Sequence, residues 1–383
     1  MVLLFDEPSQ ARLGPMGHAE PQVNWLLTST RAQAKRSRET VNSWYEAFPD
    51  HDGRLARRLR SPKDATHGQA VDELFVHHLL VRPGRLVRYE EDGSGPDYRV
   101  YEQDKLIASV EVASLFEKAE WAIEDRRHAQ LVDELNRRLD LSCGYFLDFD
   151  IDNLAGTGDP APAQVERWVR QQLRQLPAPR RTKVRGDGQF GEFTRVYSSG
   201  PVQVTMRFWP MDPDKIPQPG SPGRVVGTGR MSGGWVTDAK RLHDRVTEKA
   251  GGKYDLRSAP YLLVVGVHAA FCDDDDFVNA LYGASAVRFT VGGSGDVQPV
   301  RLNDGIFGWL GAGQAGWKNQ RLSAVCHLGA PNLWEPAKTT TVLFHNPFPA
   351  HDLPRLFEPT REFAVVESTS GRRMDWLDGR GLI

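Results

Sequence analysis

The pattern of apolar and polar residues becomes regular at about residue 65. From there GQAVDELFVHHLLV has helical spacing, LVRYEE is typical of a strand, and PDYRVY and LIASVEVASLF alternate around the turn EQDK. EKAEWAIEDRRHAQLVDELNRRL then predicts a long helix, with acids early and arginines late as the helix dipole favours, and GYFLDFDI predicts a strand. The order is helix, three strands, helix, strand. It predicts a single α/β layer of αβββαβ topology over about residues 65–150.

The later pattern predicts further elements of both kinds. AQVERWVRQQLRQL favours another helix, and a proline- and arginine-rich stretch at 177–185 marks a domain boundary. Beyond it we expect the hairpin GEFTRVYSSGPVQVTMRFWP, a helix over about 237–250, the buried strand APYLLVVGVHAA and the strands RLSAVCHL and TTTVLFHNP. We therefore predict an irregular arm over 1–42 and an α/β core within 43–176. Residues 186–383 are predicted to form a C-terminal α/β domain or an extension of the core sheet.

Composition narrows the class of protein without indicating a function. The 383 residues are 40% hydrophobic and 26% charged, an ordinary globular balance, and the formal net charge is −2. Nucleic-acid binding would therefore need a local basic patch. The three cysteines lie far apart, which disfavours a cysteine-based zinc site and fits a reducing compartment. No apolar run is long enough for a membrane span, and the N-terminus lacks the pattern of a signal peptide, so we expect a cytoplasmic protein.

Two carboxylates in the predicted hairpin are the strongest chemical signal. Asp97 begins the second strand and Glu111 lies fourteen residues later on the third, so a hairpin can bring them side by side. Paired carboxylates suit Mg²⁺ or Mn²⁺, and Glu73 on the preceding helix is a third candidate. Such a metal lowers the pKa of a bound water and neutralises charge that develops on phosphorus. The alternative is a turn-forming Asp97 and an exposed strand residue at Glu111.

The order of these motifs resembles the PD-(D/E)XK phosphodiesterase superfamily. More narrowly, VDELFVHHLL, GPDYRVY, SVEVASL and DELNRRL resemble a group of bacterial proteins with that core. The pieces PYLLVVGV, DDFVNALYG, RLSAVCHL and VLFHNPFPA extend the likeness over roughly residues 43–355. The resemblance implies a restriction-endonuclease-like αβββαβ core with a C-terminal α/β extension. It also implies a metal-dependent nuclease, with Asp97 and Glu111 as metal ligands.

One departure concerns the lysine that the superfamily places two residues after the glutamate. Here the motif reads Glu111-Val112-Ala113, so the lysine is missing. The resemblance implies that another residue supplies it, and the alternatives are Lys105, Lys118, Lys249 and Lys253. We favour Lys249 and Lys253 over Lys105, because they flank the end of a helix that leads into a buried strand.

Two hypotheses of different classes follow. The first is a Mg²⁺- or Mn²⁺-dependent hydrolase that cleaves DNA, with a role in antiviral defence suggested by analogy alone. The alternative is a catalytically inactive nuclease fold that binds nucleic acid or a protein, which the missing lysine favours. The sequence leaves a homodimer or a protein partner open.

A glycine-rich segment with two tryptophans, GWLGAGQAGW at 308–317, lies outside these motifs. It lacks the strand–loop–helix context of a phosphate-binding loop. Its two alternatives are a loop that stacks on a nucleobase and a plain surface loop.

Overall fold

The chain forms two compact units. The computed structural model describes residues 3–90, 95–152, 161–177, 193–199, 202–221, 223–227, 238–250, 259–289, 297–310, 316–368 and 371–378. The first unit comprises residues 1–9, 26–117 and 236–383, and the second comprises 10–25 and 118–235. The second unit is therefore inserted into the sequence of the first. No described helix is long and apolar enough to cross a membrane.

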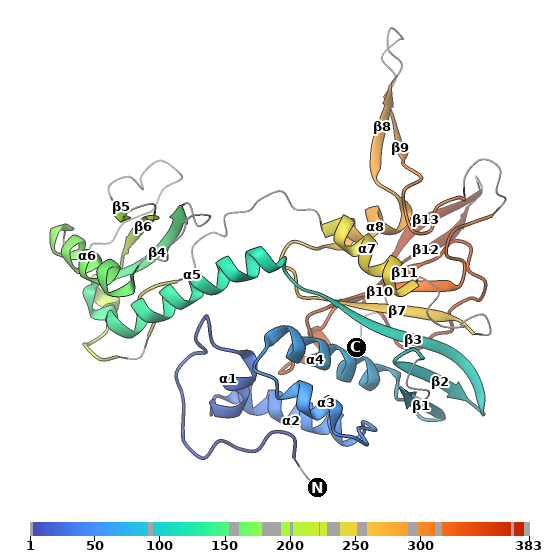
Figure 1. The fold of residues 1–383 in the computed structure, drawn as a ribbon, viewed down its shortest axis with the longest axis horizontal. Coiled ribbons are helices and arrows are strands. Elements are labelled where there is room, and N and C mark those ends of the chain that lie inside the picture. Colours follow the sequence, from blue (N-terminus) through green and yellow to red (C-terminus); the bar gives the residue numbers. More distant parts are fainter. Residues whose placement is uncertain are drawn as a thin grey trace. The chain divides into compact units, whose positions relative to one another are not determined.

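Helices and strands of the described residues are labelled as in Figure 1. The α-helices are α1 (Gln22–Thr28), α2 (Ala32–Glu46), α3 (Arg54–Leu59), α4 (Asp64–Leu80), α5 (Ala119–Arg138), α6 (Pro162–Gln175), α7 (Asp238–Ala250) and α8 (Asp274–Tyr282). The strands are β1 (Arg85–Tyr89), β2 (Tyr98–Glu102), β3 (Lys105–Leu115), β4 (Tyr145–Asp152), β5 (Thr194–Ser199), β6 (Val202–Pro210), β7 (Tyr261–Val267), β8 (Ser285–Phe289), β9 (Val297–Arg301), β10 (Leu322–Gly329), β11 (Thr341–His345), β12 (Arg361–Ser368) and β13 (Gly371–Asp378).

An eight-stranded mixed sheet organises the first unit. Its strand order is β1-β2-β3-β7-β10-β11-β12-β13. The first three strands form an antiparallel meander, and β7 and β10 continue parallel to β3. The strands after Tyr261 thus extend the sheet of the hairpin, which confirms one of the two arrangements predicted for the C-terminal part. The α/β class is also confirmed.

Local sequence explains the hairpin at the centre of this sheet. The turn between β2 and β3 places Gln103 and Asp104 at positive φ, 50° and 61°, a conformation that Asp adopts more readily than most residues. Both faces of β3 are buried from Ala108 onwards, as is typical of a strand with parallel neighbours. Helix α4 is buried on most of its surface. The amphipathic pattern predicted one buried face of this helix, whereas the structure buries most of its surface.

The predicted core over residues 65–150 is wrong in its second half. The strand β4 does not join β3; it pairs with β6 in a separate three-stranded sheet of order β4-β6-β5. The neighbour of β3 is β7, and α7 is the helix that precedes it. The strand that lies next to β3 in the sheet, and the helix that precedes it, therefore come from residues 238–267. The predicted boundaries of 43–176 and 186–383 differ from the two units accordingly.

The N-terminal region is also more regular than predicted. Helices α1 and α2 occupy much of the segment expected as an irregular arm over 1–42. Val41 and Trp44 of α2 are buried, and the ring centres of Trp44 and of Phe75 in α4 are 5.3 Å apart. This contact ties α2 to the first unit by apolar packing.

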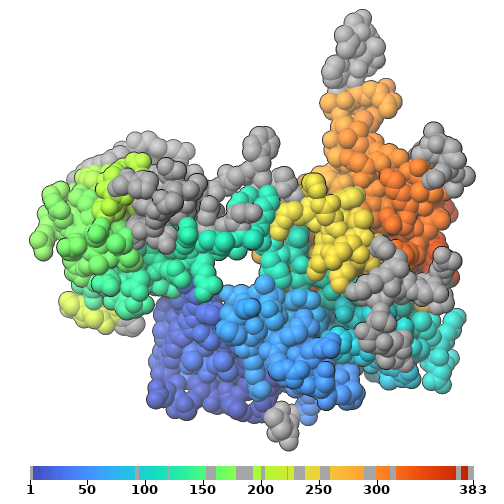
Figure 2. Space-filling model, viewed as in Figure 1, coloured from blue at the N-terminus to red at the C-terminus, as the bar shows by residue number. Residues whose placement is uncertain are grey.

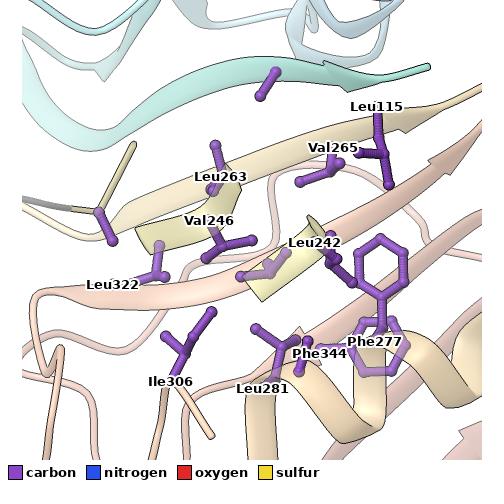
Figure 3. Packing of buried hydrophobic residues seen from close by; sticks show 14 of the residues in the cluster. Leu115, Leu242, Val246, Leu263, Val265, Phe277, Leu281, Ile306, Leu322 and Phe344 are labelled. Atoms are coloured by element: carbon purple, nitrogen blue, oxygen red, sulfur yellow. The ribbon is translucent and has the colours of Figure 1, made fainter. Parts of the chain in front are cut away.

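A continuous apolar core covers one face of the large sheet. Leu242 and Val246 of α7, and Phe277 and Leu281 of α8, pack with residues of β7, β10 and β11 (Figure 3). Helix α8 begins at a capping box, in which the Asp273 side chain accepts the N–H groups of residues 275 and 276. The opposite side of α7 is exposed, as its position on the surface in Figure 2 shows. Helix α7 thus joins this core on one side and meets solvent on the other.

Candidate functional site

Asp97 and Glu111 lie opposite each other on neighbouring strands. Tyr98 pairs with Val110 in the antiparallel ladder of β2 and β3, and Asp97 stands one step before Tyr98. The N–H of Val112 donates to Asp97 Oδ2 at 2.7 Å. This hydrogen bond holds the Asp97 carboxylate against the backbone beside Glu111. The side-by-side arrangement expected from the hairpin is present.

Lys249 reaches the same carboxylate from the helix that covers the sheet. Its Nζ lies 2.6 Å from Glu111 Oε1. Glu111 shares its face of β3 with Ala113 and Leu115, which belong to the core under α7. The Glu111 side chain is 2% exposed and the Lys249 side chain 21% exposed. The last turn of α7 therefore supplies an ammonium group to a buried glutamate.

The negative charge at this site is only partly compensated. Burial, and then the negative charges of Glu111 and Glu73, raise the pKa of Asp97 to about 8. The hydrogen bond from Val112 and the positive charge of Lys249 act in the opposite direction. A carboxylate that holds its proton near neutral pH is in an environment that favours a cation or a proton. Such perturbed groups concentrate at functional sites.

Glu73 is held differently from the expected third ligand. Both of its carboxylate oxygens accept hydrogen bonds from Arg58, at 2.7 Å each, and Tyr89 donates its hydroxyl at 3.2 Å. Glu73 is 3% exposed and Arg58 22% exposed. The carboxylate is thus committed to an ion pair between α3 and α4. It acts on Asp97 through its charge.

The donor set of the pair fits a hard divalent cation. Glu111 Oε2 is buried, and the described part of the chain offers it no hydrogen-bond partner. Within the described ranges, no group of three or more His, Cys, Asp and Glu side chains is arranged to hold a metal. Mg²⁺ often takes one or two protein carboxylates and completes its octahedron with water and substrate oxygens. Asp97 and Glu111 meet that smaller requirement.

The other candidate lysines lie in different parts of the chain. Lys105 is exposed in the hairpin turn, six residues before Glu111 on β3, a distance of roughly 20 Å along a strand. Lys118 belongs to the second unit, where its Nζ lies 4.6 Å from the ring centre of Trp121. Lys253 lies outside the described residues. Of the three described lysines, the structure brings Lys249 to Glu111.

Arg58 is the residue of this region that the sequence prediction missed. It lies in the segment RLARRL of α3, whose three arginines resemble an exposed basic turn. The carboxylates of Glu73 and Asp97, with Tyr89, raise the pKa of the Arg58 guanidinium against the opposing effect of burial. The signal that could have indicated its role is the fifteen-residue interval from Arg58 to Glu73, which spans one helical hairpin.

A pocket of about 820 Å³ lies elsewhere, in the second unit. It is lined by residues of 12–20 and α5, by Ile151 and Pro162, and by residues 223–224. No predicted site residue lines it. Its glutamates are paired with neighbouring arginines, as in Arg12–Glu20 and Arg137–Glu134.

Comparison of the chain with protein-family models, with curated proteins and with solved structures finds no match. The chemistry of the site therefore has to be argued from its own geometry.

Proposed function

We propose that the first unit is a Mg²⁺- or Mn²⁺-dependent phosphodiesterase that cleaves DNA. The observation that carries the proposal is the contact of 2.6 Å between Lys249 Nζ and Glu111 Oε1, beside Asp97, whose pKa is raised to about 8 by burial and by the charges of Glu111 and Glu73. Two carboxylates and one ammonium are the groups that a PD-(D/E)XK site requires. The helix α4, the meander β1-β2-β3, the helix α7 and the parallel strand β7 supply its αβββαβ order. In this proposal residues 118–235 are an insertion between β3 and α7.

Each residue has a distinct task in the proposed reaction. Asp97 and Glu111 would hold the divalent cation through carboxylate oxygens, and the Asp97 proton would pass to solvent. When bound, the cation would supply a water of lowered pKa and neutralise charge on the phosphate. Lys249 keeps the Glu111 carboxylate in place and presents an ammonium to the attacking water and the phosphate oxygens. Val112 fixes the orientation of Asp97 through its N–H.

The missing lysine at residue 113 has a steric reason in this arrangement. Ala113 is 0% exposed and lies in the core with Leu242 and Val246 of α7. A lysine there would have to push α7 off the sheet, and overpacking of that kind costs about 1–3 kcal/mol or more. Lys249 approaches Glu111 from α7 itself. The helix that excludes a lysine from β3 thus carries one to the same carboxylate.

A cleavage assay tests the proposal. Purified protein is incubated with supercoiled plasmid, linear duplex and single-stranded oligonucleotides in the presence of Mg²⁺ or Mn²⁺. We expect nicking or degradation that EDTA abolishes. Cleavage that survives Asp97→Ala and Glu111→Ala would contradict the assigned site.

The second hypothesis is a binding module, and the closed ion pair between Lys249 and Glu111 favours it. An ammonium that occupies one oxygen of Glu111 competes with a cation for the same carboxylate. Direct measurement of Mn²⁺ binding separates the two hypotheses. A chain that binds nucleic acid without binding Mn²⁺ and without cleavage would support the module.

A further inference from the structure

Three aromatic rings form a surface cluster that the proposed active site does not use. The Trp317 and Phe348 rings stack, with their centres 3.7 Å apart and an interplanar angle of 11°. Trp309 meets Trp317 edge to face, with the ring centres 5.1 Å apart and an interplanar angle of 86°. Trp309 is 42% exposed, as is its neighbour Leu310. We call Trp309, Trp317 and Phe348 the aromatic platform.

The platform is held on a fixed frame. Trp309 and Trp317 face each other across an antiparallel bridge. The side chain of Asn303 accepts the N–H of Trp309 at 2.7 Å and donates to its carbonyl at 2.9 Å. Lys318 donates its backbone N–H to the carbonyl of Gly308 at 2.8 Å. These bonds order an exposed tryptophan before any ligand binds, which lowers the entropic cost of binding.

The segment that leads into the platform packs on the face of the sheet that carries Glu111. Phe307, two residues before Trp309, belongs to the core on that face. Glu111 shares the face with Ala113 of the same core. The strands β3 and β10 flank β7 in the sheet, so they are about 10 Å apart.

The platform also lies at the same end of the sheet as Glu111. Asn319 connects it to the start of β10, because Asn319 Nδ2 donates to the carbonyl of Ile306 and its own carbonyl accepts the N–H of Leu322. Leu322 pairs with Tyr261, the first residue of β7, and Glu111 pairs with Leu263, two residues further along. A chain of a few nucleotides can span such an interval.

A cation completes the surface. The Lys318 ammonium donates to the carbonyl of Asn303 at 3.2 Å, and the described residues include no carboxylate within ion-pairing distance of it. An ammonium one residue from Trp317 in the sequence suits a phosphate next to a stacked base. The whole chain is close to neutral, at −2, which disfavours the broad basic face that a duplex binder presents.

We propose that the aromatic platform stacks on a nucleobase of single-stranded nucleic acid whose backbone leads to Asp97 and Glu111. This inference rests on the proposed function, because it takes the substrate of the carboxylate site to be a polynucleotide. Stacking on Trp309 recognises the aromatic face common to all bases, so the platform selects single strands over duplexes with little dependence on sequence.

The test measures binding without cleavage. Fluorescence anisotropy of a labelled oligo-dT is recorded in EDTA at fixed salt with the full-length chain. Trp309→Ala should weaken binding about tenfold or more, since a stacked base contributes roughly 1–3 kcal/mol. Trp309→Phe should restore most of the affinity. The matched control is Trp334→Ala, because Trp334 is also 42% exposed and follows the opposite end of β10; it should leave the affinity unchanged.

The outcomes separate this inference from the proposed function. Oligo-dT binding that is equal in the wild type, Trp309→Ala and Trp334→Ala would overturn the platform and leave the carboxylate site standing. Wild-type chain that binds no oligonucleotide but loses self-association on Trp309→Ala, measured by sedimentation, would assign the platform to a second copy and overturn the inference. Mg²⁺-dependent cleavage lost only in Asp97→Ala, with Trp309→Ala as active as the wild type on single strands, would do the same.

Discussion

Two pairs of carboxylates in this chain lie in β-sheets and differ in their surroundings. In the second unit, Asp148 and Asp150 of β4 both form ion pairs with Arg207 of the neighbouring β6. Trp209 donates its indole N–H to Asp148 at 2.8 Å. The two carboxylates and the guanidinium are 23–28% exposed. The Arg207 pKa is raised, chiefly by the hydrogen bond to Asp150, so this cation is firmly charged.

In the first unit the charges are more deeply buried. Glu111 is 2% exposed, its Oε2 has no partner among the described residues, and the pKa of Asp97 is raised to about 8. Arg207 donates one hydrogen bond to each of two partly solvated acids, and Asp150 Oδ1 also has no partner among the described residues. In the first unit one ammonium lies beside two buried acids. The two pairs therefore differ in burial and in the raised pKa of Asp97, and not in the presence of an unpaired oxygen.

The largest expected effect comes from removing either carboxylate of the first unit. Asp97→Ala and Glu111→Ala should each lower Mg²⁺-dependent DNA cleavage by about 1,000-fold or more, because the loss of a ligand removes the cation that activates water. Asp150→Ala, the matched change in the second unit, should leave the rate within about threefold. Plasmid nicking rates measure all three. Equal losses in both units would end the distinction between the two pairs.

Lys249 should matter next, and in a way that a structural lysine would not. Lys249→Met should lower kcat by roughly 100-fold, the range expected for one positioned catalytic group. Because the change frees Glu111 Oε1, the affinity for Mn²⁺ should stay the same or increase. Lys240→Met on the same helix is the control, since that side chain is 76% exposed and paired with Asp244.

Calorimetric titration with Mn²⁺ and initial rates give the two readouts for Lys249. Loss of metal affinity together with kcat would indicate that the lysine only supports the fold around Glu111.

The Arg58–Glu73 pair shares one feature with each of the two carboxylate pairs. Its cation is an arginine, like that of the pair in the second unit, and Glu73 is buried, like the pair in the first. Glu73→Gln should lower cleavage by about tenfold, since it disturbs Arg58 without removing a metal ligand. Glu102→Gln provides a control, because Glu102 forms a more exposed pair with Arg85. A loss as large as that of Asp97→Ala would make Glu73 a metal ligand.

The smallest effect concerns stability in EDTA. The pKa of Asp97 is about 8 in the folded chain, against an ordinary value of 3.8 for an aspartate in an unfolded chain, so the folded state binds the extra proton between these values. The free energy of unfolding should therefore fall as pH rises from about 4 to about 8. Asp97→Asn removes the charge and should raise the melting temperature by roughly 2–5 °C at pH 8.

The stabilising effect of Asp97→Asn should shrink towards pH 4, where the wild-type carboxyl is protonated. Thermal unfolding at both pH values is the measurement. Asp148→Asn, which breaks an ion pair with Arg207, should lower stability slightly at pH 8. A destabilised Asp97→Asn at pH 8 would show that the wild-type carboxylate is fully compensated.

The sequence predicts the local elements well and their partners less well. The hairpin around Gln103 and Asp104 follows from alternation and turn chemistry, so the pairing of Asp97 with Glu111 could be predicted from the sequence. The assignment of β4 to the same sheet failed because periodicity carries no information about which strand pairs with which. An inserted unit with its own helix and strand satisfies the same pattern. The core is completed only 123 residues after β3 ends, at the interval from Leu115 to Asp238.

The residues of the site were also predicted from the sequence only in part. Lys249 and Lys253 were equivalent in sequence, since both flank one helix end, and only the rotation of α7 on β3 places Lys249 at Glu111. Glu73 was predicted from its position on α4, but its engagement by Arg58 depends on how α3 packs. Long-range ion pairs of this kind join residues whose spacing follows no local period.

The most direct test is anomalous diffraction from crystals of the wild-type chain soaked in Mn²⁺. The account predicts one strong peak within about 2.0–2.3 Å of oxygens of both Asp97 and Glu111, absent in crystals of Glu111→Ala. A peak at Asp148 and Asp150 with none at Asp97 and Glu111 would contradict it. An ion pair between Lys249 and Glu111 that persists at saturating Mn²⁺, with no cation bound there, would also contradict it.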